Sequence, residues 1–312
     1  MAQIKTMRTQ IAARIEAAEG TMETLAGADA LLAGNLTYRI DTDMTPRPNV
    51  TGSLSQFSRV PGRRSATMEF EAELKGSGAA GTAPAIGRLL RACGFGETVV
   101  PSTSVTYAPA STAVPTITLG AFQDGATVFR AWGARGNVRL VFRAGQHPVA
   151  QFRFLAADFS HVDGALLTTG VVYETTIPQA FLSATLTVQG YAAIVESVEI
   201  DTGNEVVPRI DANAPSGQRV FIVANRDPIM TFDPELVTVA TADFYGQLRS
   251  GTIGALNIGP LGATAGNRVT VAAPRVQYTG ITPGDRQGIR SLGIDCALTR
   301  NAGDDELTIA FT

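Results

Sequence analysis

Three carboxylates alternate with apolar residues near position 70, and carboxylates held close together can act as a general acid and base. They are Glu69, Glu71 and Glu73, separated by Phe70 and Ala72. Like charges that share a site raise the pKa of one partner, as acid catalysis at neutral pH requires. On a strand, however, alternate residues of one face lie about 7 Å apart, and solvent screens them there. The first interpretation is therefore a solvated strand face.

The acidic pattern returns in the second half of the chain. Residues 68–74 (Met-Glu-Phe-Glu-Ala-Glu-Leu) are matched by residues 230–236 (Met-Thr-Phe-Asp-Pro-Glu-Leu), a constant offset of 162. Other positions share this offset: Pro46-Arg47 with Pro208-Arg209, Val60 with Ile222, and Arg64 with Arg226. With small slips, residues 40–42 resemble 200–202, residues 86–94 resemble 244–251, and Gly136-Asn137 resembles Gly266-Asn267. Self-similarity of this kind indicates two copies of one domain.

The repetition adds another interpretation of the acidic strand. The second copy of the pattern places Thr231, Asp233 and Glu235 where the first has Glu69, Glu71 and Glu73. A solvated face on a lone strand does not require such repetition, whereas a channel lined by both copies does. These six residues are our candidates for channel lining.

The glycine-rich run Gly76-Ser-Gly78-Ala-Ala-Gly81 has the spacing of a dinucleotide-binding loop and lies between an expected strand and an expected helix. A parallel strand buried on both faces should be continuously apolar, whereas the preceding strand alternates with glutamates. No repeating βαβ pattern follows, and the second copy has Val-Thr-Val-Ala-Thr at residues 237–241. We therefore expect a mobile surface loop and no cofactor. A nicotinamide-dependent enzyme is kept as an alternative.

The remaining chemically reactive residues form no recognisable constellation. His147 and His161 are not near a Gly-x-Ser-x-Gly nucleophile elbow. Cys93 and Cys296 match no zinc or redox spacing, so we expect buried free thiols. The sequence predicts no catalytic site, no metal site and no enzyme.

Composition favours a strand-rich protein whose surface meets other protein. The chain has 312 residues, 45% hydrophobic and only 17% charged, with 32 glycines and 16 prolines, and this length suggests about two domains. The net charge of −3 provides no basic field for holding nucleic acid. No signal peptide is recognised at the N-terminus, and no apolar run approaches a membrane-spanning length. We expect synthesis in the cytosol and no membrane contact.

Period-2 alternation over residues 66–74 predicts a strand with one dry face and one wet face. Pro84 and Gly94 then bound an expected short helix, and a second is expected at residues 243–248. For residues 1–35 helix and strand periodicities compete, and we favour an extended arm. Further strands are expected at residues 36–40, 117–119, 127–132, 137–142, 149–155, 184–188, 195–200, 206–210, 219–224, 229–236, 268–272, 276–278, 289–298 and 306–311. Residues 158–179 would link a first domain, 1–177, to a second, 178–312.

Several phrases resemble the major tail tube proteins of long-tailed bacteriophages. They are Glu-Leu-Lys-Gly-Ser-Gly-Ala-Ala-Gly-Thr-Ala-Pro at residues 73–84, Leu-Leu-Arg-Ala-Cys-Gly-Phe at 89–95, Gly-Ala-Arg-Gly-Asn at 133–137 and Gly-Asp-Asp-Glu-Leu-Thr-Ile at 303–309. The resemblance implies a virion protein of two tandem β-sandwich-like or barrel-like domains, each with one short flanking helix. Copies of such domains close into a ring, and stacked rings form a tube that conducts DNA during ejection.

The duplication favours the version in which three two-domain chains form a ring with pseudo-sixfold symmetry, with a hexameric ring as the alternative. The resemblance implies assembly in the host cytoplasm, contacts with tape-measure and tail terminator proteins, and DNA passing without specific binding. The acidic strand faces would turn inward and repel phosphate. The loop residues Lys75, Gly76, Ser77, Gly78 and Gly81, the N-terminal arm and residues 45–63 are candidates for ring-to-ring contacts. Alternatives are a tail terminator, a secretion-system tube and a surface-adhesion sandwich.

Overall fold

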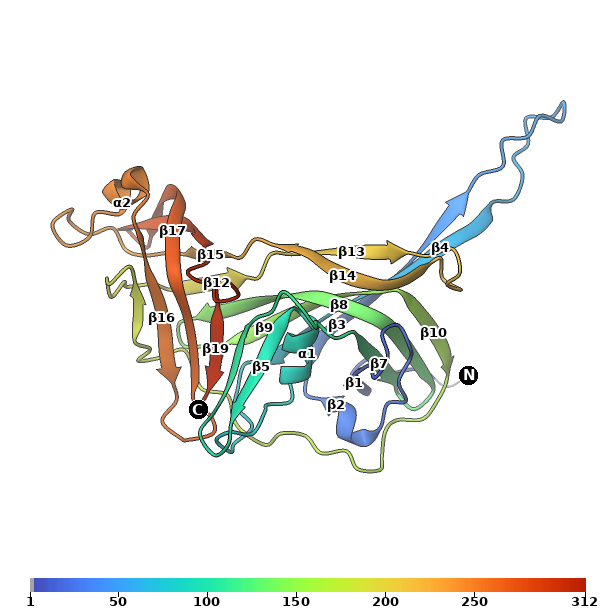
Figure 1. Cartoon of the computed structure of the whole chain (residues 1–312), viewed down its shortest axis with the longest axis horizontal. Coiled ribbons are helices and arrows are strands. Elements are labelled where there is room, and N and C mark those ends of the chain that lie inside the picture. Colours follow the sequence, from blue (N-terminus) through green and yellow to red (C-terminus); the bar gives the residue numbers. More distant parts are fainter. Residues whose placement is uncertain (1–2) are drawn as a thin grey trace.

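The chain folds into an elongated, mainly β protein, and the computed structural model describes residues 3–312. Strands make up 51% of it, most of them in a large antiparallel sheet, and two short helices accompany them. A long hairpin extends from one end of the molecule, and the helix α2 (Phe244–Ser250) lies at the opposite end (Figure 1). The expected mainly β class with short helices is confirmed.

The first half of the chain contains β1 (Thr9–Ile15), η1 (Gly27–Asp29), β2 (Ala30–Leu31), β3 (Gly34–Thr45), β4 (Val60–Glu73), α1 (Gly87–Ala92), β5 (Phe95–Val100), β6 (Ser104–Pro109), β7 (Ile117–Gln123), β8 (Thr127–Arg143), β9 (Val149–Ala156) and β10 (Asp158–Asp163). The second half contains β11 (Leu186–Val188), β12 (Ser197–Asp201), β13 (Asn204–Ile210), β14 (Gln218–Arg226), β15 (Ile229–Phe232), α2, β16 (Ile253–Leu261), β17 (Val269–Arg286), β18 (Ile289–Leu298) and β19 (Thr308–Phe311).

Eight of these strands pair in one continuous antiparallel run, which we call the central sheet. Its order is β3-β4-β9-β8-β12-β15-β18-β17. The first four strands come from the first half of the chain and the last four from the second half. The two halves meet where β8 pairs with β12, with Leu140 opposite Ile200.

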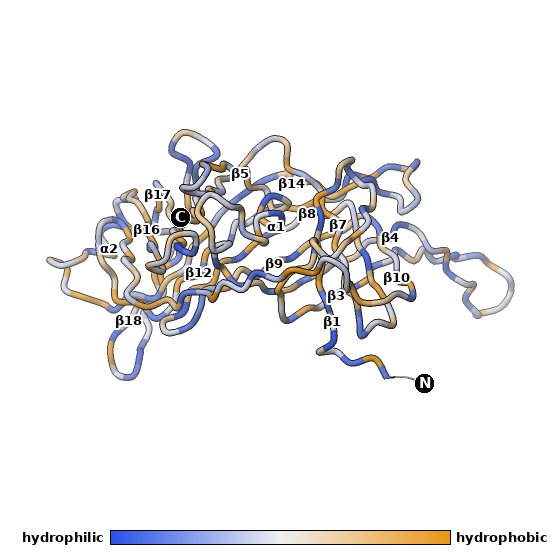
Figure 2. Tube along the Cα trace, turned by 90° about the horizontal axis from the view of Figure 1, so that it is seen from below, coloured by the Kyte–Doolittle hydropathy of each residue, from blue (hydrophilic) through white to orange (hydrophobic). Residues whose placement is uncertain are grey.

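Alternation of apolar and polar residues gives the central sheet one dry face. On β4, Met68, Phe70 and Ala72 are at most 3% exposed, whereas the intervening glutamates reach solvent. Rings from β4 and β9 pack there, with the centroids of Phe70, Phe152 and Phe154 separated by 5.8 to 5.9 Å. Hydrophobic and hydrophilic residues intersperse along the strands (Figure 2). Burial of each such ring stabilises the fold by about 1.5–3 kcal/mol.

Strand β8 belongs to two sheets because it bends near Gly133. Its first part pairs with β7 and β10, and its second part pairs with β9 and β12. Gly133 has a φ of +63°, and a Cβ there would lie 3.0 Å from the Cβ of Ala157, so the bend requires glycine. The sheet of β7, β10 and β1 shares one hydrophobic core with the central sheet.

The C-terminal strand joins the two halves a second time. Strand β19 pairs with β17 of its own half and with β6 of the first half, with Phe311 opposite Val105. The ring of Tyr107 on β6 meets that of Phe311 edge to face, at a centroid distance of 5.8 Å. Buried residues of both halves therefore form a single core cluster.

Both expected helices are present, and their ends follow the expected local chemistry. Helix α1 lies between Pro84 and Gly94, which has a φ of +87°. Helix α2 begins after Asp243, whose Oδ1 accepts a 2.8 Å hydrogen bond from the Gly246 amide. It ends at Gly251 in the left-handed region, the usual place for a C-terminal glycine.

Two expectations about organisation are wrong. The N-terminal segment is no extended arm, because β1 pairs with β7 and with β2 and buries Ile11, Ala12 and Ala13. Residues 1–2 of that expected arm lie outside the described residues. The start of the expected link at residues 158–179 is strand β10, which pairs with β8. In both cases pairing with a distant strand decides the structure.

The shared core predicts a large cost for truncating a central ring. We expect Phe154→Ala to lower the free energy of unfolding by about 3–5 kcal/mol, because the ring is fully buried between Phe70 and Phe152. The matched control is Phe57→Ala in the protruding hairpin, where the ring is 39% exposed. We expect it to change stability by less than about 1 kcal/mol. Guanidinium unfolding followed by circular dichroism measures both, and equal losses would contradict the shared core.

Candidate functional site

The polar face of the central sheet gathers most of the sequence-predicted channel residues. Directly opposite residues of paired strands point to the same face. One row runs from Glu73 on β4 through Val149 and Val141 to Glu199 and Thr231. The next row runs from Glu71 through Gln151 and Arg139 to Asp201. Glu69, Glu71, Glu73 and Thr231 therefore lie on one face, as expected for one surface.

Each glutamate of β4 contacts a different partner. Glu69 pairs with Arg153 of β9 at 3.1 Å. Glu71 accepts hydrogen bonds from Asn35 at 2.6 Å and Gln151 at 2.7 Å. Glu73 accepts one from the Lys75 ammonium at 2.7 Å. The carboxylates do not share a proton site, and the structure gives no geometry for a catalytic carboxylate pair here.

The second copy of the acidic pattern lies around one arginine. Arg286 of β17 is on the polar face and contacts Asp233 at 3.1 Å, Glu235 at 3.9 Å and Glu196 at 3.4 Å. Asp233 also accepts hydrogen bonds from two backbone amides, those of Glu196 and Ser197, both at 2.9 Å. Thr231 thus lies within the face, whereas Asp233 and Glu235 lie at its margin.

Arginines that sequence reasoning missed share this face with the carboxylates. Arg139 and Arg143 of β8 both contact Glu199, and Asn137 donates to Asp201 at 2.6 Å. The alternation of Asn137, Arg139 and Arg143 with buried residues on β8 was the available signal. The acidic side chains still outnumber the arginines; they are Asp41, Glu69, Glu71, Glu73, Glu199, Asp201, Asp233, Glu235 and Asp295 against Arg39, Arg139, Arg143, Arg153 and Arg286.

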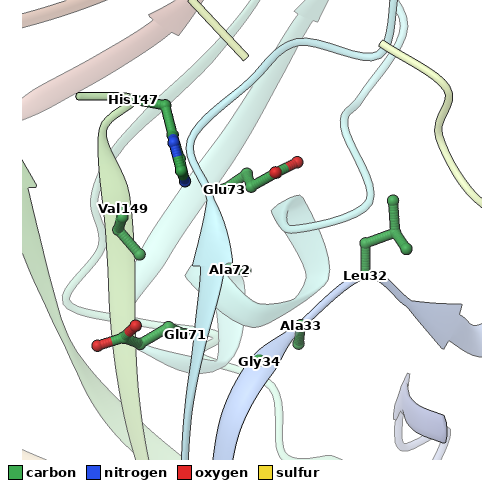
Figure 3. Close-up of a pocket in the computed structure, with 8 residues that line it drawn as sticks. All are labelled: Leu32, Ala33, Gly34, Glu71, Ala72, Glu73, His147 and Val149. Carbon is green, nitrogen blue, oxygen red and sulfur yellow. The ribbon is translucent and has the colours of Figure 1, made fainter. Parts of the chain in front are cut away.

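Two shallow hollows lie beside this face. One of about 500 Å³ is lined by Glu69, Glu71, Arg139 and Arg153 among others. The other, of about 330 Å³, lies at the ends of β3, β4 and β9 (Figure 3). His147 and Glu73 line the second hollow, but their side chains diverge, and Glu73 bonds to Lys75 instead. Neither hollow holds a nucleophile beside a base.

The glycine-rich loop is packed against the second half of the chain. Lys75 and Gly76 are buried, and the Gly76 amide donates to Asn267 Oδ1 at 3.1 Å. The Gly78 amide donates to the Gly266 carbonyl at 3.0 Å. These amides already have partners, so the loop is no free phosphate cradle. The expected mobile surface loop is therefore wrong at Lys75 and Gly76, while Gly78 stays exposed.

Both cysteines are buried and free, as expected. Burial raises the pKa of the Cys93 thiol and of the Cys296 thiol, so both stay protonated at neutral pH. Among residues 3–312, no group of three His, Cys, Asp or Glu side chains is placed to hold a metal ion. Neither helix of that range is long and apolar enough to cross a membrane.

Comparison with known proteins gives no further guide to the site. The chain matches no protein-family model, and a search of curated proteins found no match.

The packing of the loop predicts that Gly76 tolerates no side chain. A Cβ at Gly76 would lie 2.1 Å from the Gly266 carbonyl oxygen, so the two halves must separate locally. We expect Gly76→Ala to lower the free energy of unfolding by about 1–3 kcal/mol. The matched control is Gly34→Ala, where a Cβ meets nothing within 4 Å. Urea unfolding compares the two variants, and a neutral Gly76→Ala would show that the loop is loose.

Proposed function

We propose that this chain is a structural subunit that joins copies of itself into rings, which stack into the tail tube of a bacteriophage virion. The observation that carries the proposal is the central sheet. It has one dry face, one polar face with an excess of carboxylates, and two free edges at its two ends. A free sheet edge in a monomer promotes aggregation, because its unpaired backbone groups can pair with another chain. Closing the sheet into a ring removes both free edges.

The order of strands supports two tandem tail tube domains, here residues 1–177 and 178–312. The first four strands of the central sheet, β3-β4-β9-β8, have the same relation to one another as β12-β15-β18-β17. Helix α1 follows β4, and α2 follows β15. Met68 opposite Phe154 on β9 corresponds to Met230 opposite Cys296 on β18, which agrees with the offset of 162.

The strands at the two free edges correspond to two strands that pair with each other inside the chain. Among residues 3–312, β3 pairs only with β4, and residues 278–286 of β17 pair only with β18. In the proposed duplication β3 corresponds to β12 and β17 corresponds to β8. The internal β8–β12 junction is therefore a template for β17 of one copy meeting β3 of the next. A head-to-tail contact that repeats and closes produces a ring.

The exposure of apolar side chains on the free edge of β3 supports pairing of this edge with another copy. Tyr38 and Ile40 lie opposite Met68 and Ala66 of β4, on the dry side of the sheet. They are nevertheless 38% and 44% exposed, whereas Ile200 on the corresponding strand β12, which pairs with β8, is fully buried. Burying these edge residues against the next copy would extend the core across the ring.

In a ring closed in this way, the polar face lines the channel. Six four-stranded units, supplied by three chains, would surround it with pseudo-sixfold symmetry; six chains remain the alternative. Excess carboxylates repel phosphate, so DNA slides without sticking. The proposal includes stacking through loops such as the one that holds Ser77, Gly78 and Gly81, contact with tape-measure and terminator proteins, and no enzymatic activity. Lys75 and Gly76 belong to this loop but are buried within the single chain.

The edge contact predicts which substitution stops assembly. We expect Ile40→Asp to convert rings and tubes into monomers, because it places a charge on the free edge of β3. The matched control is Val172→Asp, at a side chain that is 78% exposed outside the central sheet. Size-exclusion chromatography and negative-stain electron microscopy distinguish the outcomes, and unfolding should show both variants within about 0.5 kcal/mol of the parent. Tubes of normal length from Ile40→Asp would rule out this edge.

The channel role predicts an effect on DNA passage without an effect on assembly. We expect Glu69→Lys with Glu71→Lys to leave tubes intact but to slow DNA release on the order of tenfold, because lysines beside Arg153 attract phosphate. Glu73 is left unchanged because it neutralises the buried Lys75 ammonium. Glu69→Gln with Glu71→Gln is the control that removes charge without reversing it. Release of DNA from particles carrying each variant is measured, and unchanged rates with the lysine variant would reject the lining role.

A further inference from the structure

The β13–β14 hairpin is built by the second half of the chain but rests on the first half. It crosses over β8 toward β10 and β4 (Figure 1). Asn204 Nδ2 donates to the Cys93 carbonyl at 2.7 Å and to the Gly136 carbonyl at 3.0 Å. Further along, Arg135 donates to the Phe221 carbonyl at 2.8 Å, and Val220 is fully buried. The hairpin thus fastens one unit of the central sheet to the unit beside it.

The outer part of the β3–β4 hairpin, residues 41–64, has the same construction, and we call it the arm. Thr42 lies opposite Arg64 as Asn204 lies opposite Arg226, and Met44 lies opposite Pro61 as Val206 lies opposite Val223. The register shift between these pairs occurs at the same place in both hairpins. All these correspondences keep the offset of 162. One hairpin design therefore occurs twice.

The base of the arm is held by its own chain, where Arg64 pairs with Asp158 at 2.6 Å. Beyond the base, and unlike β13–β14, residues 44–60 make no hydrogen bond or ion pair outside the arm within the described chain, residues 3–312. It extends away from the body of the molecule (Figure 1). Large apolar side chains along it are exposed: Met44 46%, Val50 99%, Leu54 100%, Phe57 39% and Val60 51%. Exposed apolar side chains gathered in one segment mark an interaction surface.

Charge favours another copy of this chain as the partner. The arm, residues 41–64, contains four arginines and two aspartates, a net charge of +2. Because the whole chain carries −3, the remainder carries −5. A basic arm and an acidic body attract each other between copies, and this complementarity steers association.

We propose that the arm of one copy crosses the second half of the next copy in the ring, in the place that β13–β14 takes on its own first half. This inference rests on the proposed ring. The strand pairing defines where the arm would contact the next copy, which we call the landing site. Gly136 on β8 lies opposite Phe154 on β9, and Tyr278 on β17 lies opposite Cys296 on β18. Tyr278 and the adjacent Thr279 therefore correspond to the region of Gly136. The end of α1 at Cys93 corresponds to the end of α2 at Gly251.

The proposed landing site is open in the single chain. Thr279 is exposed, and Tyr245 on α2 and Ile253 just beyond it are 47% and 40% exposed. Its exposed apolar side chains could pack against those of the arm. It also lies in the second half of the chain, whose free edge on β17 would meet β3 of the next copy. Thr42 of one copy would lie beside Thr279 of the next, as Asn204 lies beside Gly136 within the chain.

Cysteine cross-linking tests this placement directly. We expect Thr42→Cys combined with Thr279→Cys to form chain-to-chain disulfides on oxidation, seen as a ladder on a non-reducing gel. A bismaleimide linker tolerates a small error in register. Both positions are exposed, and the native cysteines are buried. The matched control pairs Thr42→Cys with Thr264→Cys, an exposed residue of the loop that covers Gly76, and should give no ladder.

Electron microscopy of the same samples separates this inference from the proposed function. Rings with the ladder support both. Rings that yield no ladder with either reagent, or that yield it equally with the control pair, overturn the arm placement and leave the ring. A folded chain that stays monomeric and does not cross-link overturns both.

Discussion

Backbone hydrogen bonding at the ends of the central sheet is the constraint on which the rest of this structure depends. Within residues 3–312, every strand inside the sheet has partners on both sides, but β3 and the outer part of β17 have a partner on one side only. Unpaired amides and carbonyls at these edges need water or another strand. The second sheet and the C-terminal strand cover the dry face, yet neither covers these edges. The proposed association of copies through these edges would supply such a strand.

The sequence was informative where structure is local and uninformative where it depends on distant pairing. Alternation from Ala66 to Leu74 predicted β4 and its two faces. Helix α2 begins after the capping side chain of Asp243 and ends at Gly251, both of which are local signals. The strand β1 was ambiguous because its partner β7 begins about a hundred residues later. The burial of Lys75 and Gly76 depends on packing against Asn267 and Gly266, and these residues are too distant in the sequence for a local pattern to predict the contact. Slipped matches such as Gly136 with Gly266 were misleading, because pairing relates Gly136 to Tyr278.

The polar face shows why a single strand is a poor guide to electrostatics. Along β4 the sequence reads as three carboxylates, but Arg153 and Arg139 come from the next two strands of the same face. A carboxylate beside an arginine presents a weaker field than an isolated one. The excess of carboxylates therefore repels a polyanion at long range, while the paired arginines limit that repulsion near the wall. In the proposed tube, such a surface would let a charged polymer pass, because it would neither hold nor strongly exclude it.

In the proposed ring, a tandem fusion of two units would change how assembly begins. The β8–β12 junction and the docked β13–β14 hairpin are formed within one chain, so these contacts need no second molecule. A linked partner has a far higher effective concentration than a free one, and the internal junction forms with folding itself. It also sets the angle between neighbouring units before any copy arrives. If the junction between chains repeats that angle, the geometry of β8 against β12 decides whether the ring closes. The arm would then hold neighbouring chains together as β13–β14 holds the two halves of one chain together.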